Sequence, residues 1–301
     1  MAMSWHDLLF LHWPLPPAVL APFIPPPLTL DTFDGQAWLG VVPFHMSRIH
    51  LRNLPPIPGT AAFPEINVRT YAVAPDGRRG VWFFSLDATS WLAVRAARAW
   101  FGLPYFDAVI DVKAVDQGSD ARAAATADAV ATSANDGLPP RRGIDYTSTR
   151  THRGAPAAAF NARYGPTGPV VRAAPGSLDH WLTERYALFA VDRRGRVGCG
   201  EIHHAPWPLQ PAAVELRHNT MAEPLGVMLD PVANVASVAD VADESPESHV
   251  SDGSDGSGGS AAAGAAGAIA VAATARATAP PLAHFARRLD VVAWPLRALP
   301  R

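Results

Sequence analysis

The stretch that decides the fold is FPEINVRTYAVAPDGRRGVWFFSLD, residues 63–87. Two apolar runs, Ile66–Val73 and Val81–Leu86, flank the turn-forming cluster Pro75-Asp76-Gly77. Runs rich in β-branched and aromatic residues on either side of such a cluster predict a β-hairpin. The second run is too apolar for either of its faces to lie in water. We therefore expect the hairpin to belong to a sheet that wraps around an interior.

The first strand of this hairpin has one polar face and one apolar face. Because side chains alternate along a strand, the residues divide into two sets: Glu65, Asn67, Arg69 and Tyr71 on one face, and Ile66, Val68 and Thr70 on the other. A polar face of this kind borders either water or a polar cavity. In a cavity, Arg69 is suited to hold a carboxylate through two hydrogen bonds, and Glu65 to act as a base or acceptor. The alternative is a structural Glu65–Arg69 ion pair inside the sheet.

Composition narrows the class of protein. The 301 residues are 49% hydrophobic, enough for a substantial core, and the net charge of -2 argues against a nucleic-acid or anionic-membrane partner. The apolar segment Trp5–Leu30 contains Asp7 and several prolines, so it predicts neither a membrane span nor a signal peptide. Cys199 is the lone cysteine, which excludes an intrachain disulfide. We expect a cytoplasmic protein.

Further segments predict a sheet-rich domain with few helices. Three more pairs of apolar runs around a turn predict hairpins: Leu28–Phe33 with Ala37–His45, Tyr146–Arg153 with Ala158–Tyr164, and Tyr186–Val191 with Val197–His203. Helices are predicted over Leu15–Phe23, over Ser90–Phe101 with Gly102 at its end, and over Leu178–Thr183 after the N-cap Ser177. The expected fold class is α+β, predominantly antiparallel β with a few short helices.

Two low-complexity segments, at about 118–138 and 237–278, interrupt this pattern. The first is rich in Ala, Asp, Ser and Thr, and the second contains SDGSDGSGGSAAAGAAGA. Such compositions bury too little apolar area to offset the entropy of ordering. Since Pro281–Trp294 returns to apolar sequence, we expect one domain over residues 1–301 with two solvated excursions.

The hairpin motifs PEINVRTY and GVWFFSLDA resemble the YqjF-like family of uncharacterised bacterial proteins. The similarity continues through further motifs: WHDLLFLHWP, LTLDTFDGQAWLGVVPFHMSRI, NLPPIPG, FGLPYFDA, GSLDHWLTERYALF, EIHHAPWPL and HFARRLDVVAWP. It covers nearly the whole chain outside the low-complexity segments. The family is grouped with the acetoacetate-decarboxylase-like fold. The resemblance therefore implies a β-barrel with an internal pocket.

One motif departs from what the resemblance to acetoacetate decarboxylases implies. FGLPYFDA is similar to the segment in which those enzymes carry two lysines, one forming a Schiff base and the other lowering its pKa. Tyr105 and Phe106 stand there in this sequence, and the lone lysine, Lys113, lies further along the chain. Tyrosine cannot form an imine, so decarboxylation by this route is disfavoured. Tyr105 remains either a hydrogen-bond donor or an aromatic residue packed at a strand start.

Two polar groups lie further along the chain. Neighbouring residues of a strand face opposite sides, so of Glu184 and Arg185 we expect only Arg185 to face the interior. Glu201 and His203 share a strand face at a spacing that suits two metal ligands, and a third ligand would have to come from a distant histidine. Structural histidines are the more common case, so we predict no metal and no cofactor. His203 is instead a candidate acid or base in the pocket.

These observations favour a protein with a small-molecule pocket for an organic acid or a similar polar ligand. The pocket candidates are Glu65, Asn67, Arg69, Tyr105, Arg185 and His203. Whether the protein is an enzyme stays open, and no catalytic residue is assigned. The alternative is a non-catalytic binding or scaffold domain whose polar residues are structural. Unpaired sheet edges leave a homo-oligomer open as well.

Overall fold

A computed structural model of the protein describes residues 1–50, 62–116, 142–229 and 275–299. The first expected excursion, at about 118–138, and most of the second, at 237–278, lie outside these residues. Residues 275–278, at the end of the second segment, are described. Residues Ala275–Ala277 form strand β13, which pairs in parallel with β12 (Val227–Leu229).

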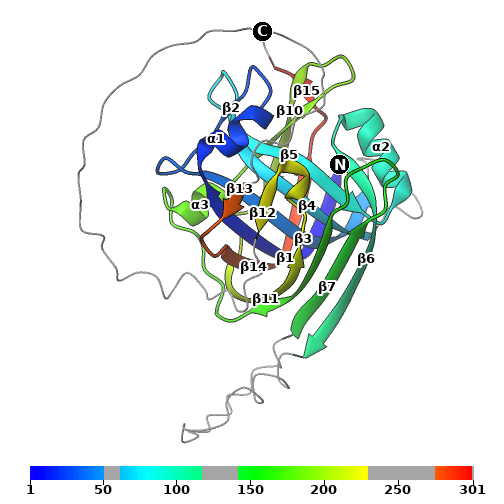
Figure 1. Ribbon diagram of the computed structural model, residues 1–301, viewed down its shortest axis with the longest axis vertical. Coiled ribbons are helices and arrows are strands. Elements are labelled where there is room, and N and C mark those ends of the chain that lie inside the picture. Colours follow the sequence, from blue (N-terminus) through cyan, green and yellow to red (C-terminus); the bar gives the residue numbers. More distant parts are fainter. Residues whose placement is uncertain (51–61, 117–141, 230–274, 300–301) are drawn as a thin grey trace, which may run out of the picture.

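The described residues form one large sheet of 13 strands and a few short helices (Figure 1). The strands are β1 Ala2–Leu15, β2 Thr29–Leu30, β3 Ala37–His50, β4 Phe63–Val73, β5 Arg79–Ala88, β6 Tyr105–Asp116, β7 Arg142–Arg150, β8 Ala159–Pro166, β9 Ala187–Val191, β10 Val197–His204, β11 Gln210–Asn219, β14 Leu282–Ala293 and β15 Arg297–Ala298. The helices are α1 Pro17–Leu20, α2 Trp91–Phe101 and α3 Leu178–Thr183, with short 3-10 turns η1 Ala21–Phe23 and η2 Glu223–Leu225. Within this sheet β5 pairs in parallel with β6 and β9, and the remaining pairs are antiparallel.

The sheet closes on itself because β5 and β14 each divide one edge between two partners. The second edge of β14 pairs with β11 near its start and with β10 near its end. The second edge of β5 likewise pairs with β9 and then with β6. Two rings result: a nine-strand ring (β5-β6-β7-β8-β11-β14-β1-β3-β4) and a seven-strand ring (β14-β1-β3-β4-β5-β9-β10). They share β1, β3, β4, β5 and β14.

Strand β4 separates the two interiors. Ile66 and Val68 are fully buried in a core cluster with Tyr146 and Phe160 of β7 and β8, inside the nine-strand ring. The opposite face, which carries Glu65, Asn67 and Arg69, belongs to the seven-strand ring. The alternation predicted for this strand is confirmed. Each face of β4 therefore serves a different interior.

The hairpin between β4 and β5 is confirmed. Ala74 donates its backbone N–H to the carbonyl of Arg78 at 2.9 Å, and Gly77 adopts the positive φ of +83° that such a turn requires. The predicted pairs β7–β8 and β9–β10 are confirmed as well. Of the hairpin predicted between Leu28–Phe33 and Ala37–His45, the Asp34-Gly35 turn is confirmed, because Phe33 and Gln36 form an antiparallel bridge across it, but the two strands do not pair beyond this bridge. Strand β3 already has β1 and β4 on its two edges, so β2 pairs with the end of β4 instead.

The first strand, β1, was not apparent from the sequence. Its residues Leu8–Leu11 are all buried, because Leu9 and Leu11 pack in the nine-strand ring while Leu8 and Phe10 pack on the other side. A strand with both faces covered shows no polar alternation. Asp7, at φ +50°, further interrupts its regular period.

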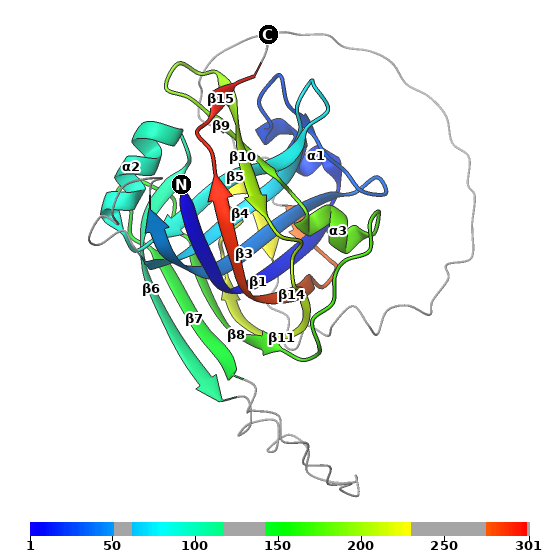
Figure 2. The same ribbon diagram turned by 180° about the vertical axis from the view of Figure 1, so that it is seen from behind.

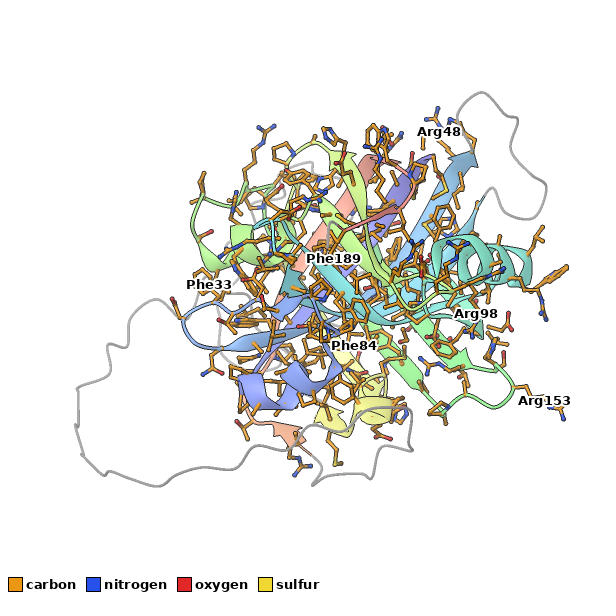
Figure 3. The ribbon with its side chains drawn as sticks, turned by 90° about the horizontal axis from the view of Figure 1, so that it is seen from above. Phe33, Arg48, Phe84, Arg98, Arg153 and Phe189 are labelled. Atoms are coloured by element: carbon orange, nitrogen blue, oxygen red, sulfur yellow. The ribbon has the colours of Figure 1, made fainter. Side chains whose placement is uncertain are left out.

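Helices α2 and α3 lie at opposite ends of the seven-strand ring (Figures 1 and 2). Both helices were predicted. Ser177 acts as the predicted N-cap and accepts from the backbone N–H of His180 at 3.3 Å, and Ser90 caps α2 in the same way, accepting from Ala93 at 3.3 Å. Arg98, labelled beside α2 in Figure 3, donates to the carbonyl of Tyr105 at 2.6 Å and ties α2 to β6. None of the helices in the described ranges has the length and apolarity needed to cross a membrane.

Candidate functional site

The seven-strand ring encloses a cavity of about 320 Å3. Every strand of the ring contributes to its wall. Helix α2 and the segment Trp294–Leu296 border the cavity at the end where Met1 and His50 lie. The cavity thus lies on the polar face of β4.

Four of the six sequence candidates line this cavity: Glu65, Asn67, Arg69 and Tyr105. His50 is the fifth polar residue among those described at its wall. The remaining lining is hydrocarbon, aromatic or thioether. A mostly apolar wall with a few convergent polar groups is typical of small-molecule pockets.

Glu65 and Tyr105 are the two wall residues whose pKa values are shifted most strongly from their ordinary values. The Tyr105 hydroxyl donates to Glu65 Oε2 at 2.8 Å. Burial of the carboxyl, which is 2% exposed, raises the pKa of Glu65 to about 8, although hydrogen bonds from Tyr105 and Asn67 offset part of this effect. Burial and the nearby Glu65 also raise the pKa of Tyr105 well above its ordinary value. At neutral pH both side chains are thus mainly neutral, and Glu65 has a proton to donate.

Asn67 lies between Glu65 and Arg69 on the same face of β4. Its Oδ1 atom is buried and has no hydrogen-bond partner among the described residues. Beside a protonated Glu65, this leaves one donor and one acceptor at neighbouring points of the wall. Together they can bind a neutral carbonyl or hydroxyl group.

Arg69 is held without an acidic partner. Its guanidinium carbon lies 5.2 Å from the centroid of the Phe10 ring, and Nε is buried without a hydrogen-bond partner. Within the described part of the chain, no carboxylate forms an ion pair with Arg69. Glu65 and Arg69 are about 13 Å apart along the strand. The structural Glu65–Arg69 ion pair considered above therefore does not form.

Gly40 makes room for Arg69 on the neighbouring strand. A Cβ atom at Gly40 would lie 3.2 Å from Arg69 Cγ and 3.2 Å from the ring of His12. Either side chain would have to shift to accept it. Two polar side chains can consequently pack side by side at the deep end of the cavity.

His12 is a polar residue that sequence reasoning missed. Its Nε2 lies 2.7 Å from the Tyr71 hydroxyl, which donates to the carbonyl of Leu182 at 2.7 Å. Burial and the nearby Arg69 lower the pKa of His12 well below its ordinary value, so the ring is neutral and donates through Nε2–H. The available signal was one histidine within the apolar run LLFLHWPL, because a buried histidine must find a partner.

The structure places Arg185 outside the cavity lining. Arg185 lies between α3 and β9 rather than in a regular strand, and its Nη1 donates to Asp31 Oδ2 at 2.7 Å. Its guanidinium also stacks on the rings of Tyr71 and Trp181, at 4.6 and 4.3 Å. The side chain is buried, and these contacts give it a structural role at the α3 end of the ring.

The structure also places His203 away from the cavity. Its neighbour Ile202 lines the cavity, so His203 faces outward from β10, where it is exposed and packs edge-on against Trp294. Across the described ranges, no group of three or more His, Cys, Asp and Glu side chains is arranged to hold a metal ion. Lys113 is 70% exposed and pairs with Asp111 on β6, so it is not a buried amine of the kind that forms a Schiff base.

The fold is similar to that of solved structures. The enduracididine biosynthesis enzyme MppR, complexed with the condensation product of pyruvate and imidazole 4-carboxaldehyde, aligns with a TM-score of 0.52 at 10% identity over 99% of this chain and 89% of that chain. MppR complexed with pyruvate gives a TM-score of 0.52 at 11% identity, over 100% and 91%. An acetoacetate decarboxylase-like enzyme from Sphingomonas wittichii RW1 gives 0.48 at 14% identity, over 99% and 92%. At these identities the likeness concerns the fold alone.

Sequence relatives are closer. Uncharacterized protein YqjF of Bacillus subtilis (strain 168) is 41% identical over 229 residues, which is 76% of this chain and 83% of YqjF. The family DUF2071, described as an uncharacterized conserved protein, matches residues 2–255. This match contains β4 with its cavity residues and every strand of the two rings except β14. The chain therefore belongs to the DUF2071 family of uncharacterized conserved proteins, as the YqjF-like motifs predicted.

Proposed function

We propose that the protein binds a small organic acid in the cavity of the seven-strand ring. The observation that carries this proposal is Arg69, a guanidinium without a carboxylate partner at the wall of a mostly apolar cavity. A charge removed from water is unfavourable until it is paired. A ligand carboxylate supplies that partner, with the planar geometry that Arg69 can bind through two hydrogen bonds.

A second part of the ligand contacts Glu65, Asn67 and Tyr105. Protonated Glu65 donates to a carbonyl or hydroxyl oxygen, while Asn67 Oδ1 accepts from a hydroxyl. A pKa of about 8 also suits Glu65 for general acid–base catalysis near neutral pH. Any turnover at this site is thus acid–base chemistry. The Schiff-base route lacks support, because Tyr105 and Phe106 occupy the lysine places and Lys113 is on the surface.

The comparisons lend support at the level of the fold. MppR has been solved in complex with pyruvate and with a condensation product of pyruvate, so this fold accommodates a small keto acid in another protein. We further propose that the closed sheet is a β-barrel of the acetoacetate-decarboxylase-like type, that the chain is one domain, and that the protein is cytoplasmic. Cys199, a buried free thiol, suits a reducing compartment.

The carboxylate contact is tested by Arg69→Gln. Hydrogen bonds to a charged group contribute about 1.5–3 kcal/mol each, so we expect the variant to bind its best carboxylate about 10- to 100-fold more weakly. Isothermal titration calorimetry against a panel of keto, hydroxy, fatty and aromatic acids measures this. Arg95→Gln, an exposed arginine on α2 that lies outside the cavity lining, is the matched control and should bind like the unmodified protein. Equal affinities for Arg69→Gln and the control would contradict the proposal.

The state of Glu65 is tested through pH. Its pKa is raised on folding from 4.5 to about 8, so the folded state holds the proton more tightly than the unfolded chain. This contribution to stability is fully present below pH 4.5 and is lost as the pH rises towards 8. Glu65→Gln mimics the protonated form, so at pH 9 it should unfold with a free energy at least about 1 kcal/mol higher than that of the unmodified protein.

Urea unfolding at pH 5, 7 and 9 measures this difference. Glu201→Gln, on the exposed face of β10, serves as the control and should leave the pH profile unchanged. A Glu65→Gln profile parallel to that of the unmodified protein would show that Glu65 ionises normally in the cavity.

A further inference from the structure

We propose that the acid is a monocarboxylate with an extended apolar body, bound with its carboxylate at Arg69 and its body directed towards α2. This inference rests on the proposed function and adds the class of ligand. It follows from three observations: the depth of Arg69, the closed end behind it, and the character of the wall in front of it.

Arg69 lies deep in the ring. Strand register places Arg69 beside Gly40, and Gly40 beside His12. The rim at the α2 end is marked by Phe63, beside Met46. Six residues of strand separate Phe63 from Arg69, a distance of about 20 Å between Cα atoms. A carboxylate that reaches Arg69 from this rim must have the rest of the ligand behind it.

The opposite end of the ring is closed. Tyr71 and Leu182 are fully buried and joined by a hydrogen bond of 2.7 Å, and Trp181 of α3 packs edge-on against Tyr71 at 4.8 Å. At the α2 end, by contrast, His50 and Pro295 line the cavity and are exposed. The open end of the cavity is therefore the α2 end. A carboxylate that enters there meets Arg69 near the closed end.

The wall between Arg69 and the rim is mostly hydrocarbon and includes one polar patch, formed by Glu65, Asn67 and Tyr105. It contains thioethers from Met3 and Met46, aromatic rings from Phe44 and Phe63, and small side chains of α2 such as Ala96. Methionine adapts to irregular apolar ligands. Apart from Arg69 and the neutral Glu65, no acid, lysine or arginine of the described residues lines this wall. A second charge held between Arg69 and the rim, where His50 and the Met1 ammonium lie, would find no charged partner.

The size of the cavity also favours a ligand with an extended apolar body. At about 30 Å3 for each water, 320 Å3 corresponds to roughly ten waters. An acid the size of pyruvate would leave most of this space unfilled, and its own contacts would be confined to the Arg69 end. A hydrocarbon or aromatic body fills the space and removes apolar wall from water.

The test is a titration series of acetate, butyrate, hexanoate, octanoate and decanoate. Each added methylene buried in the cavity should raise affinity about fourfold until the cavity is full. Octanol, which lacks the charge, and octanedioate, which adds one, should each bind at least about tenfold more weakly than octanoate. Arg69→Gln should bring octanoate down to the affinity of octanol.

A matched pair of variants on α2 tests where the body lies. Ala96→Phe places a ring in the cavity and should weaken decanoate at least about tenfold while sparing butyrate. Ala99→Phe adds the same ring to the same helix at a position outside the cavity lining and should change neither ligand. Thermal unfolding of both variants verifies that each still folds cooperatively.

The outcomes separate the two proposals. Binding that depends on Arg69 but not on chain length would overturn this inference and leave the organic-acid proposal intact. Binding of octanol as tight as octanoate would overturn it too, because the carboxylate would then be irrelevant. If no carboxylate binds in an Arg69-dependent manner, both proposals fail.

Discussion

Asp87→Asn is expected to lower the free energy of unfolding by about 3–5 kcal/mol. Asp87 accepts two hydrogen bonds from Arg150, one from Nε and one from Nη2, both at 2.7 Å. The two side chains are 0% and 2% exposed, and the guanidinium lies 4.2 Å from the centroid of the Phe106 ring. The substitution removes the negative charge and leaves Arg150 buried without compensation, which is the unfavourable half of a broken ion pair.

Urea unfolding monitored by tryptophan fluorescence measures this loss. Asp111→Asn, an exposed aspartate on β6, is the control and should change the unfolding free energy by less than about 0.5 kcal/mol. The double variant Asp87→Leu/Arg150→Met should recover much of the stability, because it replaces both charges with apolar groups. A loss below about 1 kcal/mol for Asp87→Asn alone would mean that Arg150 finds another partner.

Gly102→Ala is the second large effect, with an expected loss of about 2–5 kcal/mol. Gly102 ends α2 at φ +61°, where an L-residue is disfavoured by about 1–2 kcal/mol. A Cβ atom there would also overlap the backbone carbonyl oxygen of Val191, at 2.0 Å. Since a backbone atom cannot rotate away, α2 or β9 must move, at an overpacking cost of about 1–3 kcal/mol.

Gly77→Ala separates the two contributions. Gly77 has φ +83° but nothing within 4 Å of the added methyl group, so it should lose only about 1–2 kcal/mol. Chemical denaturation of both variants gives the comparison. Equal losses would show that the contact with Val191 relaxes freely. Because α2 lines the cavity, Gly102→Ala should also weaken carboxylate binding, whereas Gly77→Ala should not.

Elements encoded by neighbouring residues could be predicted from the sequence. The β4–β5 hairpin was identified by its turn, α2 by the helical spacing of its apolar residues and by Gly102, and α3 by Ser177, since each of these signals acts within a few residues. The closure of the sheet has no such local signal. It depends on which strand occupies each half of the edges of β5 and β14, a choice made by contacts between distant residues. The family resemblance, not the pattern, supplied the expectation of a closed sheet.

The site residues also divide into those placed by the local sequence and those placed by contacts with distant residues. Alternation along β4 placed Glu65, Asn67 and Arg69 on one face, because a long regular strand keeps its period. Arg185 is buried, as expected, but lies outside the cavity lining, because it precedes β9 and pairs with Asp31 from far along the chain. For His203 the strand VGCGEIHH is rich in glycine and gave no clear inner face. Partners of buried polar groups, such as Asp31 for Arg185, cannot be found from spacing alone.

The five shared strands act as a partition between two compartments. Along β4, Glu65, Asn67 and Arg69 line one compartment, whereas Ile66 and Val68 pack in the other. Inserting or deleting one residue in this partition would exchange the two sets at once, sending arginine into the hydrocarbon core and isoleucine to the ligand side. Its length is therefore as constrained as its composition, whereas the turn at Pro75–Arg78 can change length without disturbing either compartment.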